Sequence, residues 1–60
     1  TWVWLGSEGV SKTFTEYSLV RYGITSKWVY KWLAPGTYSL GNNVFGDPAS
    51  GSTKASYLAT

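Results

Sequence analysis

Trp28-Val29-Tyr30-Lys31-Trp32 is the stretch of this sequence that decides its fold. Residues with high strand preference fill it, and successive side chains of a strand point to opposite faces. The three aromatic side chains would then form a row on one face, while Val29 and Lys31 would lie on the other. Such a row is either the core of a small β domain or an exposed binding platform.

The two readings of this aromatic row apply to its members differently. We assign Trp28 and Tyr30 to the core, because a domain this small has few other residues to fill its interior. Trp32 keeps both readings, core and surface. Lys31 indicates that the opposite face of the strand is only partly buried.

Length and composition predict a single domain over residues 1–60. This is near the lower size limit for a chain that folds without a disulfide or a metal. The sequence has no Cys and no His, so it lacks disulfides and the commonest zinc ligands. Its eleven aromatic residues include four Trp, and each aromatic side chain buries about 150 to 250 Å². Aromatic packing is therefore expected to stabilise the domain.

The charge pattern and the short apolar runs each exclude one class of partner. Five basic and three acidic residues give a net charge of +2, and the basic residues are spread along the chain. Nucleic-acid binding needs a basic stripe or cluster, and the apolar runs here are too short to cross a membrane. We therefore expect neither a nucleic acid nor a membrane as partner.

Strand-forming residues alternate with Gly, Ser, Asn and Pro at short intervals, which is typical of an all-β chain. The Pro35-Gly36 pair predicts a type II turn that closes a hairpin between its flanking strands. We expect a small antiparallel β-sandwich or partly open barrel of about six to seven short strands. The expected strands are 1–5, 10–15, 18–22, 27–33, 37–40, 43–45 and 54–59.

The chemical inventory does not favour catalysis. Without His or Cys, the serines lack a general base and no thiol nucleophile exists. Glu8, Glu16 and Asp47 are the only acidic residues, and nothing in the sequence selects two of them as a hydrolytic pair or gathers them around a calcium ion. We expect no enzyme activity, no cofactor and no metal site.

Three blocks of the chain, in their order and spacing, resemble a small module of secreted bacterial proteins. The opening Thr1-Trp2 and the pair Glu8-Gly9 also fit, so the resemblance spans nearly the whole chain. Such modules occur singly or in tandem, are often attached to secreted hydrolases, and are thought to bind carbohydrate outside the cell. The blocks are Val20-Arg21-Tyr22-Gly23, Trp28-Val29-Tyr30-Lys31 and Asn43-Val44-Phe45-Gly46-Asp47-Pro48, followed by Gly51 and Lys54.

The chain departs from the resembled module where cysteines are expected. Leu5, Lys12, Leu40 and Ser56 stand at those positions, so packing would replace two disulfides. Trp32 stands where a smaller polar residue such as Thr is typical. The joint loss of cysteine and gain of apolar bulk is what a redesigned or strongly divergent member would show.

Leu5 also predicts the orientation of the first strand. A residue at a former half-cystine should point inward, and alternation then places Val3 inward as well. Trp2 and Trp4 would face outward on the other side. An exposed Trp pair would form a binding patch or an association surface.

Two functional hypotheses follow. The first, implied by the resemblance, is noncatalytic, lectin-like binding of polysaccharide by an extracellular module, with sugar rings stacked on exposed aromatics. The second is an engineered cysteine-free β scaffold without natural ligand, which self-associates through its aromatic face or through edge strands 1–5 and 54–59. For the first, the stacking residues are Trp4, Trp32 and Tyr22, and the hydrogen-bonding residues are Asn42, Asp47 and Arg21.

The three polar residues of the first hypothesis have structural alternatives. Asp47, which precedes a Pro, can cap a turn, and Asn42 can be a turn residue. Arg21 can stack on an aromatic ring. It can also be an exposed strand residue that pairs loosely with Glu16 or Asp47.

Overall fold

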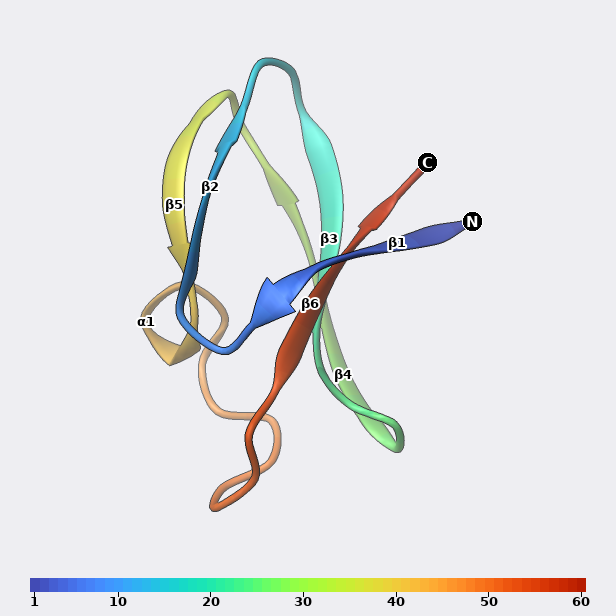
Figure 1. Ribbon diagram of the computed structural model, residues 1–60, viewed down its shortest axis with the longest axis vertical. Helices are drawn as coiled ribbons and strands as arrows, with labels where there is room; N and C mark the ends of the chain where they lie inside the picture. The colour runs from blue at the N-terminus through green and yellow to red at the C-terminus, as the bar shows by residue number, and fades with distance from the viewer.

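The computed structural model describes residues 1–60 as six strands and one helical turn (Figure 1). The all-β fold expected from the sequence is confirmed. No helix in the structure has the length and apolar character needed to cross a membrane. The elements are β1 (Trp2–Ser7), β2 (Val10–Phe14), β3 (Ser18–Ile24), β4 (Lys27–Leu33), β5 (Gly36–Leu40), α1 (Asn42–Phe45) and β6 (Ala55–Ala59).

The strands form two antiparallel sheets. One has four strands in the order β1-β6-β3-β4, and the other pairs β2 with β5. In Figure 1 the two-stranded sheet lies to the left of the larger one, and α1 lies below β5 at the lower end of the small sheet. The expectation that 54–59 is an edge strand is wrong, because β6 lies between β1 and β3. The edges of the larger sheet are β1 and β4.

The prediction of a hairpin at Pro35-Gly36 is also wrong. The strands on either side of this pair, β4 and β5, belong to different sheets, so the chain crosses here from one layer to the other. β5 pairs instead with β2, from Val10 opposite Leu40 to Phe14 opposite Gly36. The crossing lets both layers contribute to one interior, which a β4–β5 hairpin would not.

The strand expected over 43–45 is a helical turn. The backbone N–H groups of Val44 and Phe45 both donate to the carbonyl of Gly41, at 3.0 and 3.1 Å. Gly46, at φ +81, ends the turn and donates to the carbonyl of Asn42 at 2.8 Å. A left-handed residue at a helix C-terminus is readily supplied by glycine. Turn chemistry in this Gly-Asn-Asn segment therefore outweighs the strand preference of Val44 and Phe45.

The core lies between the two sheets, and α1 packs against one end of it. Val20 and Tyr22 of β3 are completely buried, and they alternate with residues of the opposite face. The buried cluster consists of Phe14, Val20, Tyr22, Leu33, Leu40 and Phe45, with contributions from both sheets and from α1.

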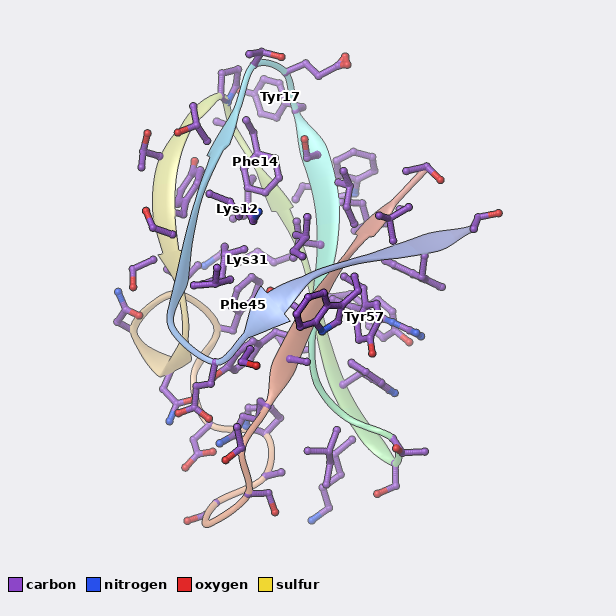
Figure 2. The ribbon with its side chains drawn as sticks, viewed as in Figure 1. Lys12, Phe14, Tyr17, Lys31, Phe45 and Tyr57 are labelled. Atoms are coloured by element: carbon purple, nitrogen blue, oxygen red, sulfur yellow. The ribbon has the colours of Figure 1, made fainter.

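The alternation expected along β4 is present, but the assignment of Trp28 and Tyr30 to the core is wrong. The small sheet covers the opposite face of β4, where Leu33 is 3 % exposed. Tyr30 is 56 % exposed and Trp32 65 %. Lys31, on the covered face, sends its Nζ across to the carbonyl of Val44 in α1 at 3.0 Å (Figure 2).

The orientation expected for β1 is correct for Leu5, which packs against the core, and for Trp4, which is 60 % exposed. A bulge between Trp4 and Gly6 interrupts the pairing with β6. Val3 faces the same side as its partner Leu58, yet it is 44 % exposed. Its expected burial is wrong because the beginning of β1 extends beyond the small sheet (Figure 1).

Lys54 is buried immediately before β6, with only 3 % of its side chain exposed. Its Nζ lies 3.0 Å from Asp47 Oδ1 and 3.4 Å from Glu8 Oε1, and it donates to the carbonyl of Ser52 at 2.8 Å. The Lys54 backbone N–H also donates to Glu8 Oε1 at 3.1 Å. This ion cluster ties the β1–β2 turn and the loop after α1 to β6.

Two buried groups predict a loss of stability at alkaline pH. Burial, reinforced by the Glu8 carboxylate, raises the pKa of Tyr22 above its ordinary value of 10.0. The hydrogen bond to Asp47 raises the pKa of Lys54 above its ordinary value of 10.5. Above pH 10 the unfolded chain therefore releases protons that the folded chain retains, which favours unfolding.

We expect the free energy of unfolding to fall as the pH rises above about 10, while these two groups contribute no pH dependence below about 9. Urea denaturation at a series of pH values from 8 to 11.5 measures this. Tyr22→Phe removes one of the two titrating groups and should make the alkaline fall shallower. A free energy of unfolding that stays constant up to pH 11.5 would contradict the assignment.

Candidate functional site

The face of the four-stranded sheet that points away from the core, here called the outer face, carries most of the large aromatic side chains. Alternation places them there, and no second layer covers them. Contiguous exposed apolar groups of this size mark binding or association surfaces. The outer-face side chains are Trp2, Trp4, Leu19, Arg21, Trp28, Tyr30, Trp32 and Tyr57.

Arg21 occupies the middle of the outer face, within three aromatic rings that we call the Arg21 cage. The guanidinium carbon lies 4.6 Å from the ring centroid of Trp2, 4.2 Å from that of Trp28 and 4.9 Å from that of Tyr57. Trp28 and Tyr57 also contact each other edge to face, at 5.6 Å. Of the alternatives for Arg21, stacking on aromatic rings is the one observed. Loose pairing with an acidic residue is not.

The Arg21 guanidinium makes no hydrogen bond and no salt bridge. Its Nε is buried and without partner, and it is the only buried side-chain nitrogen or oxygen in that condition. The two terminal nitrogens also have no partner, so they are not fully buried. The cage thus buries the inner part of the guanidinium, while its terminal nitrogens keep some contact with solvent.

A solvent-open hollow of about 420 Å³ lies at one end of the outer face. Trp32 of β4 lies opposite Leu19 of β3 in the sheet, and both line this hollow. Tyr17 comes from the β2–β3 turn (Figure 2). There the Ser18 hydroxyl donates to the carbonyl of Glu16 at 3.0 Å. We call this the Trp32 hollow; its lining is Glu16, Tyr17, Ser18, Leu19, Trp32, Leu58, Ala59 and Thr60.

A smaller hollow of about 230 Å³ lies at the opposite end of β3. Trp28 and Tyr57 of the Arg21 cage line it, together with Gly23. Its remaining lining is Ile24, Thr25, Thr53 and Ala55, and it contains no carboxylate or basic side chain. It offers less aromatic surface than the Trp32 hollow, whose Tyr17 and Trp32 are the two most exposed aromatic residues, at 70 % and 65 %.

Tyr22, expected to stack on a ligand, is a core residue. It is completely buried and stacks on Phe45, with ring centroids 4.9 Å apart and an interplanar angle of 14°. Its hydroxyl donates to Asn42 Oδ1 at 2.7 Å. Because Arg21 faces outward, its neighbour in the same strand must face inward.

The six residues expected at a binding site therefore separate into two groups. Trp32, Trp4 and Arg21 lie on the outer face, although only Trp32 lines the larger hollow. Asn42 lies in α1, where its Oδ1 accepts a hydrogen bond from the Tyr22 hydroxyl. Asp47 forms a salt bridge with Lys54. The structure does not bring these two, or Tyr22, to the outer face.

Tyr17 and Glu16 line the Trp32 hollow, but sequence reasoning did not select them for it. The signal available was the position of Tyr17, a lone aromatic residue between Glu16 and Ser18 in a polar turn. No apolar periodicity connects it to a core face. Aromatic residues in such turns are candidates for surface contact.

The outer face can bind a ligand through ring stacking and a few polar groups. The structure contains no group of three or more side chains suited to hold a metal ion. No protein-family model, curated protein sequence or solved structure matches this chain. The functional argument therefore depends on the residues of the outer face.

Proposed function

We propose that this protein is a noncatalytic carbohydrate-binding module that holds a sugar ring in the Trp32 hollow. The observation that carries the proposal is the pair of rings, Tyr17 and Trp32, exposed by 70 % and 65 % beside one open hollow. Flat aromatic rings pack well against the apolar faces of sugars. A sugar ring in the hollow would remove this apolar surface from water.

Polar groups beside the rings suit sugar hydroxyls. The Glu16 carboxylate is exposed and forms no salt bridge, so its oxygens can accept hydrogen bonds from hydroxyl groups. Thr60 lines the same hollow, and its hydroxyl can accept a hydrogen bond from a sugar hydroxyl. It already donates to the Thr1 carbonyl at 3.2 Å, which holds it in place.

Binding is favoured over hydrolysis because the hollow contains one carboxylate. Glycoside hydrolysis normally uses two carboxyl groups on either side of the scissile bond. Glu8 and Asp47, the other acidic residues, both bind Lys54. Glu16 therefore has no acidic partner in the Trp32 hollow.

Trp4 extends the proposed contact for longer ligands. It lies on β1, at the opposite edge of the sheet from Trp32 on β4. Three strand spacings separate these edges, or about 14 Å. A polysaccharide that crosses the sheet would contact both side chains, while a disaccharide in the Trp32 hollow would not reach Trp4.

We expect Trp32→Ala to weaken disaccharide binding about tenfold, because loss of one stacked ring corresponds to roughly 1.4 kcal/mol. Trp4→Ala is the matched control, since it removes the same side chain at nearly the same exposure, 60 %. It should leave disaccharide affinity unchanged and weaken polysaccharide binding. A glycan array selects the sugar, calorimetry measures both variants, and circular dichroism checks that each remains folded.

Absence of binding across a broad glycan array would overturn the proposal. The engineered-scaffold hypothesis predicts a different use of the same surface, in which two copies cover each other's outer faces. Sedimentation at several concentrations separates the two. We expect a monomer, whereas a stable dimer that Trp32→Ala dissociates would favour self-association.

A further inference from the structure

We propose that the outer face selects acidic polysaccharides, with Arg21 binding the carboxylate of a uronic acid next to the sugar in the Trp32 hollow. This inference rests on the proposed carbohydrate binding and specifies its ligand class. It also assigns a ligand to a charged group that the fold alone leaves without a counterion.

The charge inventory is the first step. The chain has three acidic residues. Glu8 and Asp47 contact Lys54, and Glu16, in the Trp32 hollow, makes no salt bridge with Arg21. The Arg21 guanidinium therefore has no carboxylate partner although its Nε is buried. A partly desolvated cation without a counterion favours the approach of an anion.

The geometry of the Arg21 cage is the second step. The guanidinium carbon lies 4.6 and 4.2 Å from the ring centroids of Trp2 and Trp28, and this packing holds the side chain in place before a ligand arrives. The buried Nε is closed to a ligand, and the two terminal nitrogens are the open edge. Two parallel N–H donors on one edge match the two oxygens of a planar carboxylate.

The surroundings strengthen this interaction. Aromatic rings around the guanidinium lower the local dielectric, so an ion pair formed there is less screened than one between freely exposed side chains. The cage also reduces the rotamer entropy that an Arg side chain loses when it binds a ligand.

The position of Arg21 relative to the Trp32 hollow is the third step. Leu19, which lines the hollow, precedes Arg21 by two residues on the outer face of β3, a separation of about 7 Å. Across the sheet, Arg21 and Trp4 both pair with Tyr57, on its two sides. Arg21 thus lies between the two exposed Trp residues proposed to contact a polysaccharide.

The test compares three disaccharides on the unmodified protein by calorimetry: one with a uronic acid, its carboxyl-reduced neutral counterpart, and one with a sulfate ester. We expect the uronate to bind about tenfold more tightly than the neutral sugar, a difference that one bidentate charged contact supplies. The difference should shrink as salt increases.

Two variants assign this preference to Arg21. Arg21→Gln should abolish the preference, so that the uronate and the neutral sugar bind with equal affinity. Arg21→Lys keeps the positive charge but lacks the planar guanidinium that can pair with both carboxylate oxygens, so it should retain only part of the preference. If Arg21→Gln fails to fold, the salt dependence of the unmodified protein and the affinities of Arg21→Lys still test whether Arg21 causes the preference.

The outcomes separate this inference from the proposed function. Equal affinity for uronate and neutral sugar, with both lost in Trp32→Ala, overturns the role of Arg21 and keeps the carbohydrate module. Tighter binding of the sulfate ester than of the uronate overturns the choice of carboxylate. An Arg21-dependent preference for uronate that Trp32→Ala does not affect supports the Arg21 site and overturns the hollow. No binding of any disaccharide overturns both.

Discussion

Tyr22→Ala is expected to leave most of the protein unfolded at room temperature. Tyr22 is completely buried, stacks on Phe45 and anchors Asn42 of α1 through its hydroxyl. Truncation of a buried aromatic residue to Ala costs about 3 to 5 kcal/mol. A domain of this size has a free energy of unfolding of only about 3 to 9 kcal/mol. Urea denaturation followed by circular dichroism measures the loss.

Tyr22→Phe is the matched control. It keeps the stacked ring and removes only the hydrogen bond to Asn42, which is worth about 1 kcal/mol. The variant should remain folded and bind the disaccharide with unchanged affinity. If Tyr22→Ala were as stable as the unmodified protein but lost glycan affinity, Tyr22 would be a surface contact and the core described here would be wrong.

Lys54→Met is expected to cause the second largest loss of stability. Lys54 is 3 % exposed and binds Asp47, Glu8 and the Ser52 carbonyl, so its removal separates three segments. The carboxylates of Glu8 and Asp47 would then repel each other without the cation between them. The urea midpoint at pH 7 measures the effect.

The pH dependence of the variant identifies the cause. Stability lost through repulsion between two carboxylates should return as the pH falls from 7 to about 4, because protonation removes the charge. Lys27→Met removes an exposed Lys whose side chain makes no hydrogen bond or salt bridge, and it should leave the midpoint nearly unchanged. Equal effects of the two substitutions, or no recovery in acid, would show that the ion cluster does not stabilise the fold.

The sequence predicts which residues form strands better than which face of each strand is buried. Along β4 the alternation is as expected, but Val29 and Leu33, not Trp28 and Tyr30, face the core. A period of two is the same whichever face is covered. The choice depends on where the small sheet packs, and its β2–β5 pairing joins segments distant in sequence. Local patterns do not contain that information.

Strand alternation also predicts only part of the candidate site, because it does not show which face of each strand is exposed. Alternation with Leu5 predicts the outward orientation of Trp4, but it leaves Trp32 either in the core or at the surface, where the structure places it. Selecting both Arg21 and Tyr22 as ligand contacts was inconsistent with alternation, since adjacent strand residues point to opposite faces. Tyr17 joins Trp32 only through the fold, because the β2–β3 turn lies beside the end of β4.

The central claim, that the outer face binds a sugar at Trp32, is tested most directly by the indole N–H signals of the four Trp residues in an ¹⁵N-correlated spectrum. Single Trp→Phe variants assign these signals. On saturation with a bound disaccharide, we expect a large shift of the Trp32 signal and little change in that of Trp4. Four unchanged signals, or a shift of Trp4 without Trp32, would contradict it.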